Sequence, residues 1–290
     1  MFDIIIIGAG PAGLSAAITA RARDKKVLVI SNMPQESPLA KAKLIDNYPG
    51  LPQVSGLHLL KTMVSHAHGL GAEFIYDRVI SVLPLKDGFV VATGSANFDA
   101  RSIILATGMQ LAKPFVGEAE FLGKGVSYCA TCDGMLYRTQ TVCVVGLNAE
   151  AETEANFLAS IGAQVIFLAK KAPQGLDKAI MVEEGTVKEI TGDERGVTAL
   201  VFKAKQTGKI ESISCGGVFI LRPSIAPDAL TAGLALSDGH VATDAAMSTN
   251  IPGVFAAGDC VGKPLQVAKA VGEGQCACFS AVQYLDTSAF

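Results

Sequence analysis

The sequence predicts an α/β protein made of two Rossmann-like, three-layer domains, the second inserted into the first. Three observations carry this prediction. An apolar run at the N-terminus ends in a glycine cluster and continues as an alanine-rich helical stretch. A weaker copy of this strand, turn and helix begins near residue 141. A strand-like segment and a long helical stretch close the chain, so the polypeptide leaves one domain, builds a second and returns.

The composition indicates a packed globular protein and excludes several classes. The chain has 290 residues, of which 50% are hydrophobic and 18% are charged, a balance typical of folded domains. The longest apolar runs are only as long as strands, so we expect no membrane span. The net charge is −3 and no basic stripe is interleaved with aromatic residues, so we expect no nucleic-acid partner.

The N-terminus and the cysteines indicate a compartment. Met1 leads directly into a strand, without the basic start and cleavage site of a signal peptide, so we expect a cytoplasmic protein. Seven cysteines are an odd number and do not suggest a secreted disulfide framework. Any disulfide in this chain is therefore expected to be catalytic.

The opening unit is a predicted strand at 2–7, a helix to about residue 22 and a second strand at 26–30. The turn between the first strand and the helix has the sequence Gly8-Ala9-Gly10-Pro11-Ala12-Gly13. This is a dinucleotide-binding pattern in its expected context. Gly8 allows the tight turn, Gly10 lets the backbone approach a pyrophosphate, and Gly13 lets the helix pack closely on the strand. A glycine turn that binds nothing is the alternative.

The middle and end of the chain alternate apolar runs with turn residues. In the first domain we expect strands at 79–83, 89–92 and 102–106, a strand-like segment at 251–259 and a helix at 265–284. In the inserted domain we expect a strand at 141–145, a helix at 149–160, and strands at 164–168 and 218–221. A predicted linker at 111–114 and a predicted hinge at 238–239 separate the two domains. The predicted boundaries are 1–112 with 239–290, and 113–238.

Two cysteines separated by two residues are the most specific signal. Cys129 and Cys132 can close a small, reversible disulfide, and Asp133 beside them is a nearby proton carrier. A zinc or iron-sulfur centre needs further ligands at suitable spacing, which the other cysteines do not supply, so we expect no metal. We expect the remaining cysteines to be packed small hydrophobes: Cys143, Cys215, Cys260, Cys276 and Cys278.

Four segments together resemble the low-molecular-weight thioredoxin reductases, in the same order and over essentially the whole chain. They are 8–13, Ala106-Thr107-Gly108, 129–133 and 249–259. The resemblance implies an FAD domain made from both ends of the chain, an inserted domain that carries the disulfide, a homodimer, and thioredoxin as electron acceptor. It also implies that Cys132 faces the flavin, that Cys129 exchanges with thioredoxin, and that Asp133 is the general acid and base.

The FAD contacts are assigned in part from this resemblance. The acidic residue expected after the second strand is replaced by Ser31 and Asn32, which can still hydrogen-bond a ribose. The start of the closing helix would point its positive dipole at the flavin, although that helix could also only complete the core. The family's Gly-Gly-Gln segment is replaced by Ser37-Pro38-Leu39. Besides Gly8, Gly10, Pro11, Ala12 and Gly13, the predicted FAD contacts are Ser31, Asn32, Asn47, Val79, Thr107, Gly108, Gly258, Asp259, Gln266 and Val267.

The second glycine turn, where the family binds NADPH, has lost the pattern. Only the first glycine of the pattern is kept at Gly146, and Asn148 puts a side chain where the backbone must approach phosphate. Glu150, Glu152 and Glu154 add negative charge that a bound pyrophosphate would oppose. The family's His-Arg-Arg clamp is replaced by Ala169-Lys170-Lys171. These lysines keep some room for NADPH, although a solvated charge pair is the commoner explanation.

This damaged pattern resembles the pyridine-nucleotide-independent, ferredoxin-linked thioredoxin reductases of anaerobic bacteria. The resemblance implies reduced ferredoxin as donor. A plant-type ferredoxin near about −400 mV and a thioredoxin near about −270 mV differ by roughly 130 mV, or about 6 kcal/mol for two electrons. Flavin can join the two, because it accepts electrons singly and delivers them in pairs.

Three other functions stay open at this point. The chain could be an NADPH-dependent thioredoxin reductase with an atypical nucleotide site. It could also reduce another thiol partner, such as a peroxiredoxin or a glutaredoxin-like protein. Outside the enzymes, it could be a flavoprotein that only senses redox state, although the intact cysteine pair and Asp133 argue against this.

Overall fold

The computed structural model describes residues 1–108, 114–148, 151–222 and 225–287. Two compact units divide the chain. One is Met1–Leu111 with Ser224–Phe290, and the other is Ala112–Pro223. The second boundary differs from the expected hinge at 238–239, because the short helix α5 (Pro227–Leu230) packs against strand β4 of the first unit. Most of the expected linker at 111–114 lies outside the described residues.

The first unit is built on a mixed sheet with the strand order β3-β2-β1-β6-β5-β4, and β16 also pairs with β6. Five strands are parallel: β1 (Phe2–Ile7), β2 (Val27–Ser31), β3 (Glu73–Tyr76), β6 (Asn97–Leu105) and β16 (Val254–Ala256). Two continue the sheet in antiparallel pairs: β4 (Val79–Leu85) and β5 (Gly88–Thr93). A separate small hairpin joins β14 (Leu236–Ser237) and β15 (His240–Val241).

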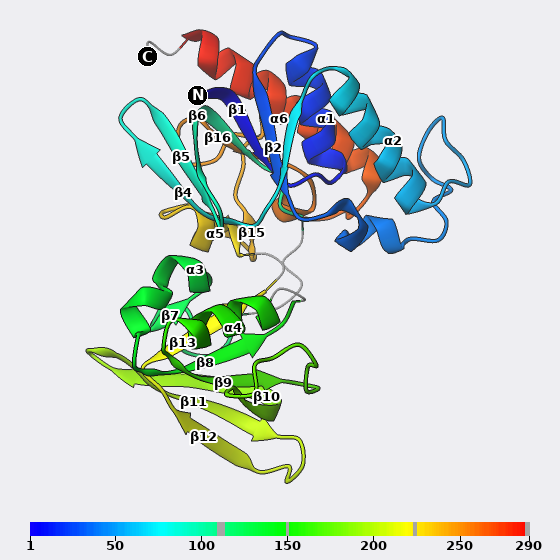
Figure 1. The fold of residues 1–290 in the computed structure, drawn as a ribbon. Helices are drawn as coiled ribbons and strands as arrows, with labels where there is room; N and C mark the ends of the chain where they lie inside the picture. The colour runs from blue at the N-terminus through cyan, green and yellow to red at the C-terminus, as the bar shows by residue number, and fades with distance from the viewer. Residues whose placement is uncertain (109–113, 149–150, 223–224, 288–290) are drawn as a thin grey trace. The chain divides into compact units, whose positions relative to one another are not determined.

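Helices cover the parallel part of this sheet (Figure 1). They are α1 (Pro11–Arg21), α2 (Gly56–Gly69) and α6 (Val267–Thr287), with short 3-10 turns η1 (Pro34–Glu36), η2 (Leu39–Lys41) and η4 (Gly258–Val261). The isoleucines of β1 are buried on both faces of the strand, which is typical of a central parallel strand. Small residues let α1 and α6 approach closely: a methyl group on Gly274 would overlap the backbone of Ala12, and the Ser15 hydroxyl donates to the Val271 carbonyl (2.7 Å).

The second unit has a seven-stranded sheet with the order β12-β11-β10-β9-β8-β13-β7. Its parallel strands repeat the opening unit: β7 (Val126–Ser127), β8 (Thr141–Gly146), β9 (Gln164–Ala169) and β13 (Gly217–Leu221). The sheet extends into a meander that the sequence analysis does not predict: β10 (Met181–Asp193), β11 (Gly196–Ala204) and β12 (Ile210–Ser214). The other elements are α3 (Ala130–Asp133), η3 (Gly134–Tyr137) and α4 (Ala151–Ser160).

The predicted fold class is confirmed by this pair of sheets with the repeated strand, turn and helix. The expected strands at 141–145 and 164–168 are β8 and β9, each extended by one residue. The expected strand at 251–259 is shorter, because Gly253 adopts a positive φ of 82° and turns the chain before β16 begins. Among the described residues, no helix is long and apolar enough to cross a membrane.

A buried ion pair holds the second unit together. The carboxylate of Glu118, 1% exposed, pairs with the guanidinium of Arg222, 5% exposed, and one of the two contacts measures 2.8 Å. The Tyr128 hydroxyl (2.9 Å) and the Phe115 backbone N–H (2.7 Å) donate to the same carboxylate. The Arg222 guanidinium also lies 4.7 Å from the centre of the Phe115 ring. The charge of Glu118 is therefore fully compensated inside the unit.

Removing the carboxylate of Glu118 should destabilise the second unit. In Glu118→Ala we expect the free energy of unfolding of the second unit to fall by about 3–5 kcal/mol, because Arg222 stays buried without its counter-charge. Urea unfolding followed by circular dichroism measures this. Lys205→Ala is the matched control, since it breaks an exposed ion pair of the same unit. Equal unfolding midpoints for the two variants would contradict the expectation.

Candidate functional site

A disulfide joins Cys129 and Cys132 in the second unit, with the two Cα atoms 5.3 Å apart. Strand β7 ends just before it, and Cys129 is the N-cap residue of the one-turn helix α3. Cys129 is 2% exposed, whereas Cys132 is exposed. The local fold therefore presents the two sulfur atoms differently.

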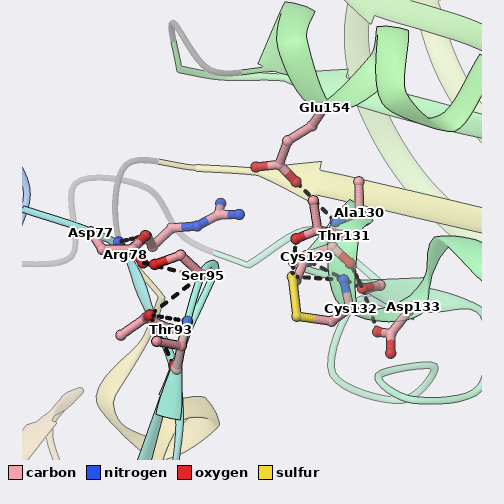
Figure 2. Close-up of a disulfide and its surroundings, with 12 residues drawn as sticks. Asp77, Arg78, Thr93, Ser95, Cys129, Ala130, Thr131, Cys132, Asp133 and Glu154 are labelled. Atoms are coloured by element: carbon pink, nitrogen blue, oxygen red, sulfur yellow. Dashed lines mark hydrogen bonds between the residues drawn. A yellow bond between two sulfur atoms is a disulfide. The ribbon is translucent and has the colours of Figure 1, made fainter. Parts of the chain in front are cut away.

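Hydrogen bonds surround this disulfide (Figure 2). The Cys132 N–H donates to the Cys129 sulfur (3.1 Å), and the Thr131 hydroxyl lies 3.3 Å from the same sulfur. The Ser127 hydroxyl accepts from the Cys129 N–H (3.1 Å) and donates to the Asp133 carboxylate (2.6 Å). The Cys132 N–H and the Thr131 hydroxyl can stabilise a negative charge on the Cys129 sulfur. Ser127 orients the carboxylate of Asp133.

Two contacts of this loop were not anticipated from the sequence. Ser127, buried at the end of β7, reaches both Cys129 and Asp133. The Glu154 carboxylate, from the first turn of α4, accepts a hydrogen bond from the Ala130 N–H (2.8 Å). The only sequence signal for Glu154 is its position near the start of a helix, where a carboxylate would oppose a bound phosphate; nothing in the sequence points to its contact with the disulfide loop.

The other cysteines are suited to packing more than to redox chemistry. Burial raises the pKa of Cys215 to about 12, of Cys260 to about 11 and of Cys278 to about 12, and raises that of Cys143 well above its ordinary value. These four thiols stay protonated and unreactive at neutral pH. Cys276 is exposed on α6, so the expectation that it is a packed hydrophobe is wrong. Cys278, two residues later on the same helix, is buried, because residues i and i+2 point in different directions.

The glycine turn of the first unit has the shape that a phosphate needs. A methyl group on Gly8 would overlap the Ala106 carbonyl, and one on Gly13 would overlap the Gly8 carbonyl. By contrast, no atom lies within 4 Å of a methyl group placed on Gly10. Helix α1 begins at Pro11 without a side-chain cap, so the N–H groups of its first turn face this open side.

Further predicted contacts gather at the carboxyl ends of the parallel strands, beside this turn. Ser31 ends β2, and Thr107 and Gly108 follow β6. Gly258 and Asp259 follow β16, in η4. In a parallel sheet these ends share one edge, where dinucleotides bind. The Thr107 hydroxyl oxygen is buried there, and the only side-chain group that interacts with it among the described residues is the weakly hydrogen-bonding Cys260 thiol, so the hydroxyl can still bond to a ligand.

The remaining predicted contacts bond to one another or lie next to these residues in the chain. The Asn47 side-chain amide donates to the Gln266 side chain just before α6 (2.8 Å), and Val267 is the first residue of that helix. Val79 begins β4, two residues after Asp77, whose N–H donates to the Ser31 carbonyl (3.1 Å). Asn32 directly follows Ser31 in the chain.

Two residues of α6 hold the η4 turn, and the sequence analysis missed both. The Lys269 ammonium donates to the Gly258 (3.0 Å) and Gly262 (2.6 Å) carbonyls, and the Glu273 carboxylate accepts from the Gly258 N–H (2.9 Å). Lys269 and Glu273 also pair with each other at 3.1 Å. Burial raises the pKa of Asp259 in this turn, while Lys269 opposes the rise.

The second glycine turn keeps its tightly packed first glycine and differs from the first turn at the next position of the pattern. A methyl group on Gly146 would overlap the Phe167 ring, and the Asn148 amide donates to the Arg222 carbonyl (3.4 Å). Ala149 and Glu150 lie outside the described residues. The Glu152 carboxylate accepts from the Gly175 N–H (2.7 Å) in the loop after β9. Where the first turn has Gly10, this one has Asn148, whose side chain stands at the point where the backbone must approach a pyrophosphate.

No metal centre emerges from the structure. Across 1–108, 114–148, 151–222 and 225–287, no three His, Cys, Asp or Glu side chains are grouped to hold an ion. The cysteine pair and the first glycine turn are therefore the two chemically distinctive features of the described chain.

Comparisons with known proteins agree with both features. Residues 2–274 match the pyridine nucleotide-disulphide oxidoreductase family. Over 99% of its length the chain is 34% identical to the thioredoxin reductases of Listeria innocua and Treponema pallidum, covering 94% and 98% of those proteins. The crystal structure of a ferredoxin-flavin thioredoxin reductase from Clostridium acetobutylicum is similar with a TM-score of 0.87 at 40% identity, and the match covers 99% of each chain.

Proposed function

The chain belongs to the pyridine nucleotide-disulphide oxidoreductases and, among them, to the thioredoxin reductases, and from this premise we propose that it reduces thioredoxin with electrons from reduced ferredoxin. It is a flavoprotein disulfide oxidoreductase that carries FAD. When bound, FAD supplies the conversion of single electrons into pairs, which a one-electron donor and a disulfide require.

One observation carries the choice of donor. The two glycine turns of the chain differ: the first leaves open space at Gly10, whereas Asn148 stands at the corresponding position of the second and bonds to the Arg222 carbonyl. A pyrophosphate needs close approach to backbone N–H groups and a helix N-terminus. In the second turn, the Glu152 carboxylate is also tied to the neighbouring loop. A chain that has an FAD-binding site and no NADPH-binding site requires another electron donor. The 40% identity to a ferredoxin-flavin thioredoxin reductase supports ferredoxin.

The proposed FAD site uses the residues at the carboxyl edge of the first sheet. The N–H groups at the start of α1, next to Gly10, would hold the pyrophosphate. Thr107 has a buried hydroxyl to offer, and Lys269 and Glu273 hold Gly258 and Asp259 in place. The other predicted contacts that end or border this edge would complete the site: Ser31, Asn32, Asn47, Val79, Gly108, Gln266 and Val267.

The proposed disulfide chemistry divides the two sulfur atoms between partners. Two electrons break the bond between Cys129 and Cys132, and each sulfur that becomes a thiol takes one proton. In this proposal Cys132 faces the flavin and Cys129 exchanges with thioredoxin. Asp133, held by Ser127 at 2.6 Å, supplies and removes the protons. Because Cys129 is 2% exposed, its exchange with a partner requires the loop to open.

The proposal also includes a homodimer, which the family resemblance implies, and a cytoplasmic location, which is expected from the N-terminal sequence. Sedimentation of the purified holoenzyme measures the first, and fractionation of producing cells measures the second.

A titration of the flavin tests the donor. Under anaerobic conditions, reduced ferredoxin should bleach the flavin absorbance of the purified protein within the mixing time. NADPH and NADH should bind at least about 100-fold more weakly than in an enzyme with an intact turn, the effect of losing about 2.7 kcal/mol of binding. Rapid bleaching by NADPH, with thioredoxin reduced in steady state, would reject the ferredoxin assignment.

An NADPH-dependent reductase is the second candidate, and one observation favours it. Lys170 and Lys171 are exposed directly after β9, where a 2′-phosphate could meet them. Neutralising both lysines should leave the ferredoxin-driven rate unchanged in the first proposal and should raise the Michaelis constant for NADPH in the second.

Comparing thioredoxin with a peroxiredoxin and a glutaredoxin-like protein as acceptors would identify the thiol partner.

A further inference from the structure

Glu154 connects the start of helix α4 with the loop that carries the disulfide. It lies in the first turn of α4, and its carboxylate accepts the Ala130 N–H at 2.8 Å (Figure 2). We propose that Glu154 is a positioning residue that shapes the disulfide loop and biases the Cys129/Cys132 couple toward the oxidised form. The proposal rests on the proposed function, since it assigns a role in that reaction.

The contact with Glu154 fixes the geometry of the disulfide loop. Ala130 follows Cys129 directly, begins α3 and is completely buried. Without an acceptor its N–H would be a buried, unsatisfied donor, because the first N–H groups of a helix have no partner within it. Helix α3 has only four residues, and this bond fixes its first N–H group. The same turn aims the Cys132 N–H at the Cys129 sulfur (3.1 Å).

The negative charge of Glu154 also acts on the reduced form of the cysteine pair. Reduction breaks the bond between the two sulfur atoms and adds two electrons. If Cys132 takes a proton and Cys129 stays a thiolate, one negative charge appears on the Cys129 sulfur. The Cys132 N–H and the Thr131 hydroxyl stabilise that charge, whereas a carboxylate bonded to the next residue destabilises it. The neutral disulfide is not affected in this way, so the charge of Glu154 favours the disulfide over the thiolate form.

Glu152 is a matched control on the same helix turn. Both glutamates are half-buried, and each accepts a hydrogen bond from a backbone N–H. The partner of Glu152 is Gly175, in the loop after β9, and not a residue of the disulfide loop. Glu152→Gln therefore removes an equal charge from α4 while leaving the Ala130 contact in place.

The test measures the thiol-disulfide equilibrium of the FAD-loaded, full-length chain. Wild type, Glu154→Gln, Glu154→Ala and Glu152→Gln are equilibrated anaerobically with mixtures of reduced and oxidised dithiothreitol and quenched with acid. Free thiols are alkylated, and the peptide that carries Cys129 and Cys132 is quantified by mass spectrometry. We expect Glu154→Gln to raise the ratio of dithiol to disulfide by about three- to tenfold, where tenfold corresponds to about 30 mV.

Glu154→Ala should shift the ratio in the same direction, and Glu152→Gln should leave it within about twofold of wild type. A ratio for Glu154→Gln within that range would overturn the proposal, as would an equal shift in Glu152→Gln. The measurement uses neither ferredoxin nor thioredoxin. Its failure is therefore distinguishable from failure of the proposed function, which would appear as a wild-type protein that does not turn over with reduced ferredoxin and thioredoxin.

Discussion

Cys132→Ser is expected to keep its FAD and to lose thioredoxin reduction by on the order of 10³-fold or more, the scale of losing a reacting group. A serine hydroxyl cannot form a disulfide with Cys129, so the pair of electrons has no covalent path from the flavin side to the acceptor. The measurement is the steady-state rate of thioredoxin reduction with reduced ferredoxin as donor. Cys276→Ser is the control, because that thiol is exposed and free, on α6 of the other unit.

The same variant examines which sulfur serves which partner. With Cys132 gone, the remaining Cys129 thiolate should attack a thioredoxin that lacks its second active-site cysteine and carries 2-nitro-5-thiobenzoate on the first. The nitrothiobenzoate leaves as a coloured thiolate, and a stable mixed disulfide between the two proteins remains. If only the reciprocal variant Cys129→Ser captures thioredoxin, the two roles are reversed. Preserved physiological activity in Cys132→Ser would instead favour the redox-sensing alternative over the enzyme.

Gly13→Ala should remove FAD from the protein. The new methyl group would overlap the backbone carbonyl of Gly8, so α1 must move away from β1. Because the carbonyl is backbone, no side-chain rotation can relieve the clash. The displaced helix would no longer aim its first N–H groups at the pyrophosphate, and we expect FAD affinity to fall at least about 100-fold, or about 2.7 kcal/mol. The flavin content per chain after purification and a fluorescence titration with FAD measure this.

Gly272→Ala is the control for that experiment. It lies in α6, where no atom is within 4 Å of an added methyl group, so it should bind FAD normally. A Gly13→Ala protein that retains stoichiometric flavin would show that the first glycine turn is not the phosphate seat.

The features that sequence alone could reveal are those encoded by neighbouring residues. Strand β1 was predicted with its observed bounds, because an uninterrupted isoleucine run is long enough for a buried strand and too short for a helix. The glycine turn after it and the cysteine pair are also local patterns, in which spacing reports geometry directly. By contrast, the meander β10–β12 was missed. Its strands mix exposed charges with buried apolar residues, as in the Met181–Asp193 strand, and their pairing depends on residues distant in the chain.

The contacts that surround the disulfide and the η4 turn could not be predicted from neighbouring residues. Glu154 meets Ala130 across 24 positions of sequence, and Glu273 meets Gly258 across 15. No periodicity or spacing announces such a pair, since each contact exists only after two separate elements have packed. Residue order thus determined the fold class, the intact first glycine turn, the altered second one and the reactive cysteines, because each is written in a short window. Folding in three dimensions decided which side chains surround the disulfide, which polar groups stay unsatisfied for a ligand and which thiols are buried, because burial and hydrogen bonding depend on distant segments meeting.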